Sequence, residues 1–332
     1  MNARIAVPNG TVQFPRVGVG AGSLANAAGE QAFFDMIHAA WASGVRYFDT
    51  SAAYLGGESE QRLGAALAEY PRDELYVSTK LGRYLSQPGA SSLPGGSDFY
   101  LDYTYDATLR SVERSLSRLK VDRLDAVFIH DLDPGFAQTA YRDELMTAVE
   151  GAFAALQRLK DEKVVGAIGV ASMDWQACLD FAELASVDVV MPAGEYSLLR
   201  TGSTALLEHC VENGIAWIAA SPFNSGILAT GSRPGAFYNM RPATRPALLQ
   251  TEGLERICQR HHVCLATAAL LFPLRHSAVS TIVFGAKTAD EFNESFARLS
   301  ESLSDQFWQE MDAFLAETKG WEGRSSVGWQ GA

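Results

Sequence analysis

The sequence predicts a closed (β/α)8 barrel, a TIM barrel of parallel strands. Eight short, nearly all-apolar runs alternate with longer segments whose apolar residues recur at helical spacing. Strands of this composition are typical of a parallel sheet that helices cover, and closing the sheet gives a barrel. The length of 332 residues also suits the fold, since such barrels take about 250 residues plus insertions.

The expected elements follow in order along the chain. A β-hairpin is expected first, at about residues 4–14, because the Pro-Asn-Gly sequence at 8–10 contains a strong two-residue turn signal. Apolar stripes at 109–119 and 145–159 predict two of the covering helices. The eight barrel strands are expected at residues 17–20, 46–49, 75–79, 126–129, 165–170, 187–191, 216–220 and 281–284.

No linker or internal repeat divides the chain, so a single domain is expected over residues 1–332. Long connections in a compact domain are usually functional. The first of them contains Tyr84 and other aromatic residues, which predicts a wall over an active site. In the C-terminal tail, Trp321 and Trp329 are equally compatible with a lid and with packing anchors. The long connections are residues 81–103, 131–144, 223–247 and the tail, about 318–332.

An open, doubly wound sheet is the alternative fold. Gly18, Gly20 and Gly22 give the pattern G-x-G-x-G at the first strand, but Ser23 stands where the last glycine of the dinucleotide-binding motif should be. The glycine pattern is therefore too weak to favour the open sheet.

Composition excludes several classes of partner. The net charge of −12 and the pI near 5.0 argue against nucleic acid and against an anionic membrane surface. The N-terminus lacks the apolar stretch of a secretory signal, and no apolar run reaches the ~18–20 residues that span a bilayer. The four cysteines lack metal-ligand spacing and are expected to be reduced, mostly buried thiols, so a cytoplasmic protein without a metal site is predicted.

Ionisable residues stand where three successive apolar strands stop. Asp49 ends one strand and Tyr54 follows it by five residues, Lys80 ends the next, and His130 ends the third. A lone Lys, Asp or His at such a place is normally a solvated or packing residue. Together these four residues converge on the C-terminal rim of the barrel, which is where this architecture places catalysis.

The four residues can perform acid–base chemistry. A phenol with an ordinary pKa near 10 is a poor acid or base at neutral pH, and the ammonium of Lys80 would lower the pKa of Tyr54. Asp49 can hold Lys80, and His130 can donate to a substrate oxygen. Because the sequence shows no nucleophile elbow and no metal cluster, hydride transfer with a nicotinamide is the expected reaction.

The motifs around these residues resemble those of the aldo-keto reductase family. The resemblance covers roughly residues 14–300 and places the family's catalytic set on Asp49, Tyr54, Lys80 and His130, in the right order. The matching motifs lie at 48–54, 57–64, 78–80, 125–130, 167–170 and 284–287.

Two further segments, 192–199 and 221–228, are similar to one subgroup of that family. The subgroup contains D-threo-aldose 1-dehydrogenase, L-fucose and L-galactose dehydrogenases and pyridoxal 4-dehydrogenase. The resemblance implies that the chain oxidises a cyclic hemiacetal to a lactone with NAD.

The resemblance also implies a set of cofactor contacts. The chain departs from the family at two of them, since Ala171-Ser172 replaces Ser-Asn and the usual glutamine is absent near Ala193-Gly194. The implied contacts are Gly22, Asp49, Ser172, Tyr196, Ser221, Pro222, Phe223, Asn224, Gly226, Leu228, Gly285, Lys287, Glu291 and Ser295.

NAD is expected in preference to NADP. NADP-preferring relatives place an arginine where this chain has Glu291, next to Asp290. Two carboxylates would repel a 2′-phosphate, whereas one of them can accept hydrogen bonds from a free ribose diol. Lys287 is the counter-argument, because its ammonium could bind a phosphate.

The expected reaction uses Tyr54 as the general base, with Tyr54, Tyr84 and His130 as substrate contacts. The partner is a small sugar or a pyridoxal-like molecule, and the oligomeric state is left open. Two alternatives remain: an aldehyde or ketone reductase that uses NAD(P)H, and a nicotinamide-binding regulatory subunit with little turnover.

Overall fold

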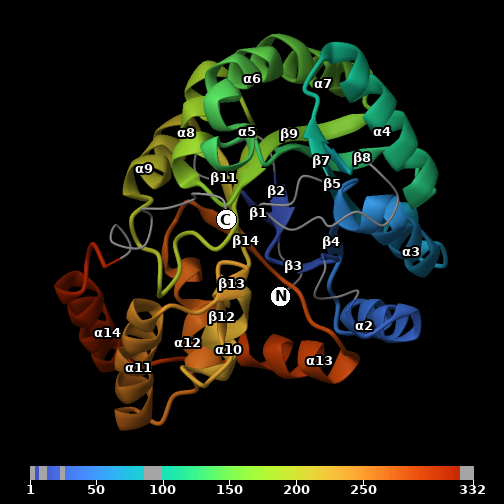
Figure 1. Ribbon diagram of the computed structural model, residues 1–332. Helices are drawn as coiled ribbons and strands as arrows, with labels where there is room; N and C mark the ends of the chain where they lie inside the picture. The colour runs from blue at the N-terminus through green and yellow to red at the C-terminus, as the bar shows by residue number, and fades with distance from the viewer. Residues whose placement is uncertain (1–3, 7–12, 23–26, 86–98, 322–332) are drawn as a thin grey trace.

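The computed structural model describes residues 4–6, 13–22, 27–85 and 99–321. Eight parallel strands form a closed barrel in which β14 pairs with β3 to join the two ends of the sheet (Figure 1). The predicted (β/α)8 barrel is therefore confirmed, and the open sheet was the wrong alternative. The barrel strands are β3 (Val17–Gly20), β4 (Tyr47–Asp49), β5 (Tyr76–Leu81), β8 (Leu124–His130), β9 (Val165–Ser172), β10 (Val189–Pro192), β11 (Ala216–Ala220) and β14 (Val279–Phe284).

Amphipathic helices cover the outside of the barrel (Figure 1). The stripe predicted at 109–119 lies in α4, but the stripe at 145–159 is split, because a π-helical stretch, η4 (Ala148–Phe153), joins α6 to α7. Local sequence sets helix starts: Asp174 accepts hydrogen bonds from the first backbone N–H groups of α8. The covering helices are α2 (Glu30–Ala42), α3 (Glu58–Leu67), α4 (Tyr105–Leu119), α6 (Tyr141–Thr147), α7 (Ala154–Asp161), α8 (Trp175–Leu184), α9 (Thr204–Asn213), α12 (Leu265–Leu271) and α13 (Ala289–Arg298).

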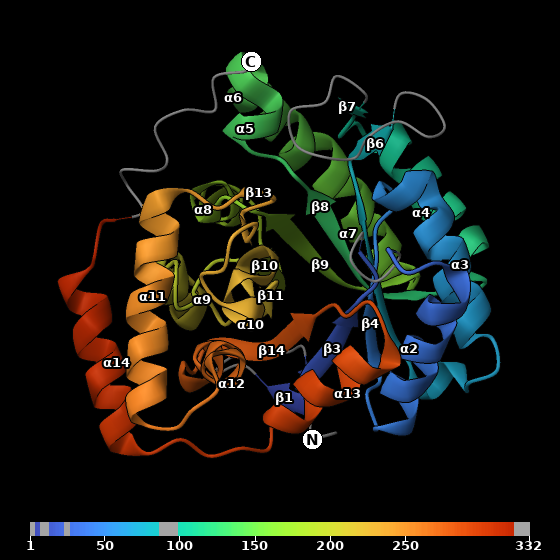
Figure 2. The ribbon, with the colours of Figure 1, turned by 60° about the horizontal axis from the view of Figure 1, so that its bottom comes forward.

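Further helices pack beside the barrel. The long helices α11 (Arg245–Arg260) and α14 (Asp305–Glu317) lie side by side, with the short α10 (Ile227–Thr230) nearby (Figure 2). They share a second hydrophobic cluster, in which the ring of Trp321 packs 5.8 Å from that of Tyr238. Trp321 is thus a packing anchor, whereas Trp329 lies outside the described residues.

Short elements complete the chain. The predicted N-terminal hairpin is confirmed as an antiparallel pair of β1 (Arg4–Ala6) and β2 (Gln13–Pro15), and its predicted turn at 8–10 lies outside the described residues. The connection at 81–103 contains a second hairpin, β6 (Arg83–Leu85) with β7 (Phe99–Leu101). The others are α5 (Pro134–Ala137), β12 (Phe237–Tyr238), β13 (Arg241–Pro242), η1 (Tyr54–Gly57), η2 (Arg72–Glu74), η3 (Gln138–Ala140), η5 (Asn224–Gly226) and η6 (Pro273–Arg275).

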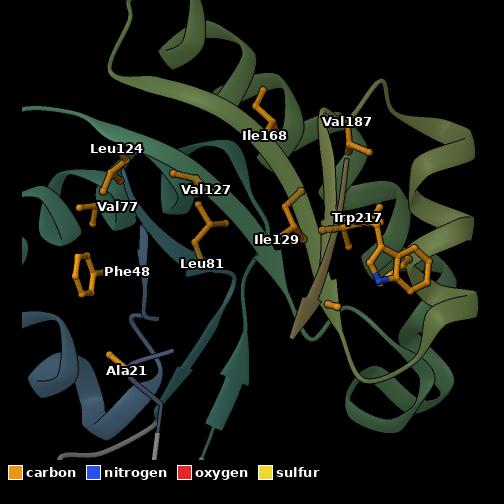
Figure 3. Packing of buried hydrophobic residues seen from close by; sticks show 14 of the residues in the cluster. Ala21, Phe48, Val77, Leu81, Leu124, Val127, Ile129, Ile168, Val187 and Trp217 are labelled. Atoms are coloured by element: carbon orange, nitrogen blue, oxygen red, sulfur yellow. The ribbon is translucent and has the colours of Figure 1, made fainter. Parts of the chain in front are cut away.

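Strand alternation divides the core into two layers. On β8, Val127 and Ile129 face the helices and belong to the large outer cluster shown in Figure 3. Phe128 faces the barrel interior, where it shares a cluster with Tyr47 and Tyr76. Because residues two apart share a face, the strand positions two residues beyond these three also face inward, at the C-terminal rim.

The cysteine side chains are thiols that form no disulfide among the described residues. Cys178, Cys210 and Cys258 are buried, Cys264 is exposed, and all four are unpaired, as predicted. Burial raises the pKa of the Cys210 thiol to about 12, so this cysteine stays protonated. Within the described part of the chain, no helix is long and apolar enough to cross a membrane.

Candidate active site

The structure brings the four predicted catalytic residues together. Asp49 and His130 are the last residues of β4 and β8, and Lys80 lies near the end of β5, the strand between them in the sheet. The η1 turn after β4 carries Tyr54, whose ring centroid lies 5.8 Å from that of His130 and 5.2 Å from Lys80 Nζ. The inward parity of strands β4, β5 and β8 explains this convergence, because Asp49, Lys80 and His130 stand two residues or four beyond interior aromatic residues.

Lys80 is buried and held by oxygen atoms. Its ammonium pairs with Asp49 Oδ2 and donates to the carbonyl oxygen of Thr50 at 2.8 Å. The other oxygen of Asp49 accepts a hydrogen bond from Ser78 Oγ at 2.6 Å. Burial lowers the pKa of Lys80, but the charges of Asp49 and Tyr54 outweigh burial and raise that pKa above its ordinary value. Lys80 is therefore a fixed cation at neutral pH.

Tyr54 differs from the expectation in one respect. Lys80 does pull the pKa of Tyr54 down, through its charge and a hydrogen bond, as predicted from the sequence. Burial of the phenol is the larger effect, and together with the charges of Asp49 and Asp131 it raises the net pKa above 10. The prediction of a lowered pKa was wrong for the protein alone, because it left out desolvation. The phenol keeps its proton at neutral pH.

His130 is a neutral imidazole. Burial, and then the positive charges of Lys80 and Arg83, hold its pKa well below 6.5. Its Nδ1 lies 3.1 Å from Ser51 Oγ, and Tyr103 donates to its carbonyl oxygen at 2.7 Å. The ring is thus fixed in place and is suited to hydrogen bonding at neutral pH.

An ion pair that the sequence did not reveal lies next to His130. Arg83, the first residue of β6, donates from Nη1 to Asp131 Oδ2 at 2.7 Å, and both side chains are buried. The same oxygen is 3.5 Å from His130 Nε2. Arg83 belongs to a long connection whose strand character was not predicted, which is why its orientation went unrecognised.

The neighbouring Tyr84, predicted to contact substrate, faces the other way. Its hydroxyl accepts a hydrogen bond from the backbone N–H of Gly82 at 3.3 Å and lies near Ser111 of helix α4. Residues next to each other on a strand point to opposite faces, so the β6 residue beside His130 and Asp131 is Arg83. Strand alternation would have found this, had the hairpin been recognised.

Ser172 is engaged away from the barrel interior. Its hydroxyl donates to Asp133 Oδ2 at 2.5 Å and accepts from the backbone N–H of Asp174 at 3.0 Å. Since the single proton of Ser172 is already used, its predicted contact with the cofactor cannot be a hydrogen bond donated by this hydroxyl in this arrangement. Burial, followed by the charge of Asp131, raises the pKa of Asp133 to about 7.

This buried carboxyl predicts a pH effect on stability. A carboxyl whose pKa is higher in the folded than in the unfolded protein binds extra protons when folded, so its contribution to stability falls as the pH rises from about 4 to about 7. Asp133→Asn keeps a helix-capping side chain for α5 and removes the titration. Urea unfolding at pH 5 and pH 8 should therefore show a smaller loss of stability in the variant than in the wild type, by about 2–3 kcal/mol. Equal losses in both proteins would contradict the assignment.

Most of the predicted cofactor contacts, all except Asp49, Ser172 and Tyr196, follow three neighbouring strands at the same rim. Ser221 to Leu228 follow β11, Gly285 to Ser295 follow β14, and Gly22 follows β3, and these strands adjoin in the order β11, β14, β3. A methyl group on Gly22 would lie 3.8 Å from the Tyr54 ring. The part of the rim at the end of β3 is therefore next to the predicted catalytic residues.

The loop after β11 has an unusual backbone. Ser221, Asn224 and Ser225 all adopt left-handed φ values, between 45° and 64°, which are uncommon outside glycine. Asn224 is buried and donates to the carbonyl oxygen of Gly194 at 2.8 Å, while its Oδ1 has no hydrogen-bond partner among the described residues. A buried acceptor without a partner at this rim fits an N–H or O–H donor of a nicotinamide dinucleotide.

The loop after β14 also fits a dinucleotide. Glu291 is exposed at the start of α13 and accepts a hydrogen bond from the backbone N–H of Lys287 at 2.9 Å. Ser295 lies one turn further along the same helix. Exposed carboxylate oxygens here are suited to ribose hydroxyl groups.

Tyr196 and Leu228 do not lie among the catalytic residues, whereas Phe223 stays at the rim beside β14. The ring of Tyr196 packs 5.2 Å from Phe272 and 5.5 Å from His276, in the outer helical layer and not among the catalytic four. Leu228 is buried in the second hydrophobic cluster, and Phe223 packs half-buried, 6.4 Å from the ring of Phe284. No group of three His, Cys, Asp or Glu side chains in the described residues could hold a metal ion.

Known proteins share both the sequence and the fold. Residues 16–316 match the sequence model of the Aldo/keto reductase family. D-threo-aldose 1-dehydrogenase of Pseudomonas sp is 34% identical over 90% of this chain and 93% of its own length, and pyridoxal 4-dehydrogenase of Microbacterium luteolum is 33% identical over 82% and 85%. The structure of an aldo-keto reductase from Bacillus halodurans, in its holo form, superimposes with a TM-score of 0.76 at 19% identity, covering 95% of this chain and 96% of that one.

Proposed function

The chain belongs to the Aldo/keto reductase family and is therefore an oxidoreductase that uses a nicotinamide cofactor, and we propose that it oxidises the cyclic hemiacetal of an aldose to a lactone with NAD. The observation that carries the proposal is the buried pair of Lys80 and Asp49 beside Tyr54 and a neutral His130. We further propose that residues 1–332 act as one barrel domain.

Two relatives support the substrate class. The names of the Pseudomonas and Microbacterium enzymes specify an aldose and pyridoxal as their substrates. L-Fucose, L-galactose, another D-threo-aldose or pyridoxal are accordingly the candidate substrates of this chain. Each can present a carbon that carries both a hydroxyl group and a hydrogen, as hemiacetal oxidation requires.

Each catalytic side chain has its own role in the proton transfer. His130 donates a hydrogen bond to the substrate oxygen and so orients the reacting hydroxyl toward Tyr54. Tyr54 accepts the proton of that hydroxyl, and Lys80 stabilises the phenolate form by its charge. Asp49 keeps Lys80 in place and charged.

When bound, NAD supplies the hydride acceptor, and its positive nicotinamide ring favours the ionised phenol. The loops after β11 and β14 would hold it, with Asn224 Oδ1 as a buried acceptor and Glu291 toward the adenosine ribose. Ser221, Pro222, Phe223, Gly226, Gly285, Lys287 and Ser295 belong to the same proposed site.

One observation favours a second candidate function. Because the phenol of Tyr54 keeps its proton in the protein alone, Tyr54 is already a general acid of the kind that aldehyde or ketone reduction requires. Reduction with NAD(P)H would use the same residues in the opposite direction.

A substrate panel measured with both cofactors tests the proposal. We expect an aldose or pyridoxal to be oxidised with kcat/KM for NAD at least about tenfold above that for NADP, because like charges in contact cost several kcal/mol. Glu291→Gln should narrow this ratio, whereas Glu294→Gln, an exposed change on the same helix, should leave it unaltered. Carbonyl reduction with a strong NADPH preference and no aldose oxidation would replace the proposal by the second candidate.

A further inference from the structure

The buried ion pair of Arg83 and Asp131 is placed to act on His130. Arg83 and His130 approach the same oxygen atom, Asp131 Oδ2. Arg83 Nη1 donates to it at 2.7 Å, and His130 Nε2 lies 3.5 Å from it. The side chains of Arg83 and Asp131 are 5% and 9% exposed, so solvent screens this contact little. The pair is not part of the proton-handling set described above.

Aromatic rings hold the guanidinium of Arg83. Its central carbon lies 4.8 Å from the ring centroid of Phe99 on β7 and 4.5 Å from that of Phe136 on α5. Such stacking fixes a guanidinium and leaves its edge free for a carboxylate. Arg83 therefore links the β6–β7 hairpin, helix α5 and the end of strand β8.

The backbone of Asp131 has an uncommon conformation that a hydrogen bond holds in place. Its φ of 52° is left-handed, and its N–H donates to the carbonyl oxygen of Ala171 at 2.9 Å. A left-handed residue other than glycine costs about 1 kcal/mol or more and persists where the surroundings hold it. In this conformation the carboxylate of Asp131 lies 3.5 Å from Nε2 of the preceding residue, His130.

We propose that Arg83 and Asp131 are positioning residues that hold His130 in the tautomer with its proton on Nε2. A carboxylate only accepts hydrogen bonds, so Asp131 Oδ2 opposite Nε2 favours an N–H at that atom. Nδ1 is then the acceptor, and it receives the hydroxyl proton of Ser51 at 3.1 Å.

Ser51 agrees with this assignment. Its Oγ accepts the backbone N–H of Ala53 at 3.1 Å and keeps one proton and one lone pair, so it can donate to Nδ1 of His130 or accept from it. Ser51 therefore accommodates the Nε2–H tautomer, and Asp131 decides between the two forms. The consequence for catalysis rests on the proposed function: the Nε2 proton is the one that His130 shares with the substrate oxygen.

Charge explains why both members of the pair are needed. Burial raises the pKa of Asp131 above its ordinary value, and the guanidinium of Arg83, 2.7 Å away, is the main influence that pulls this pKa back down. Lys80 is the other nearby cation, and its charge acts in the same direction. Without Arg83, Asp131 would gain a proton and could donate to His130, which would remove the preference for Nε2–H.

Nitrogen NMR of ring-labelled histidine tests the tautomer in the free protein. At pH 7 we expect His130 to carry its proton on Nε2 in the wild type, and Arg83→Met to convert it largely to the Nδ1–H form or to a mixture. Arg83→Met should lower kcat by about tenfold to 100-fold, the usual effect of losing a partner that orients a functional histidine. Arg83→Lys, which can still pair with Asp131, should restore the tautomer and most of kcat.

Two further variants separate positioning from folding. Arg72→Met breaks a similar pair, with Asp125 at 2.8 Å, at the N-terminal end of the barrel, and it should change neither the His130 tautomer nor kcat. If Arg83→Met alone fails to fold, Arg83→Met/Asp131→Gly removes both charges and suits the left-handed backbone. This double variant leaves no acceptor opposite Nε2, so it too should lose the preference.

The proposal is overturned if Arg83→Met or the double variant folds with His130 still in the Nε2–H form. It is also overturned if either variant folds with kcat within about twofold of the wild type while the wild-type enzyme turns over. Because the NMR signal needs no substrate, it tests the tautomer even if aldose oxidation is not found. A failure of the proposed function is thereby distinguished from a failure of this inference.

Discussion

Replacing Tyr54 with Phe is expected to lower kcat by about 10²- to 10⁴-fold, the usual contribution of a general acid or base. The change removes one hydroxyl group and leaves the ring that packs against His130. The affinity for NAD should stay within about twofold, because that hydroxyl acts on the substrate. Steady-state oxidation of the best aldose, together with NAD titration by fluorescence, measures both quantities.

Tyr70→Phe is the matched control. Tyr70 stacks on Trp41 at a centroid distance of 4.1 Å in the helical layer, so its hydroxyl should not matter to turnover. If Tyr54→Phe retained a tenth or more of the wild-type kcat, Tyr54 could not be the proton-transfer residue.

The second large effect is expected from Lys80→Met. The change leaves the carboxylate of Asp49 buried without its cation, which should cost about 3–5 kcal/mol in the free energy of unfolding. Turnover should fall by at least about 10²-fold, because Tyr54 loses the charge that stabilises its phenolate. Urea unfolding and steady-state kinetics on the same preparation measure the two losses.

The double variant Lys80→Met/Asp49→Asn separates stability from chemistry. With neither charge left unpaired, most of the lost stability should return, whereas turnover should stay low. Recovery of both stability and turnover would mean that Lys80 serves only to balance Asp49.

The sequence predicted those features that regular periodicity determines. All eight barrel strands were found near their predicted positions, and strand ends brought Asp49, Lys80 and His130 together without any knowledge of long-range contacts. Parallel strands explain this success, since their carboxyl ends meet at one rim.

What the sequence could not predict depends on orientation and environment. Tyr84 was chosen and Arg83 overlooked because the alternation of β6 is visible only once the strand is known. The pKa of Tyr54 needed the extent of its burial, which no motif reports. Tyr196 follows the end of a strand, as the catalytic residues do, and was predicted to contact the cofactor. Its backbone is left-handed, and its ring packs against Phe272 in the outer helical layer, which the sequence did not indicate.

The central claim is that a substrate held at Tyr54 and His130 gives up a proton to the protein and a hydride to nicotinamide. The most direct test uses an aldose labelled with deuterium on its anomeric carbon and follows the label by NMR after turnover with NAD. The account predicts that the deuterium appears on the nicotinamide ring of the reduced cofactor and that the sugar product is a lactone. Deuterium released to the solvent, with no label on the cofactor, would contradict it.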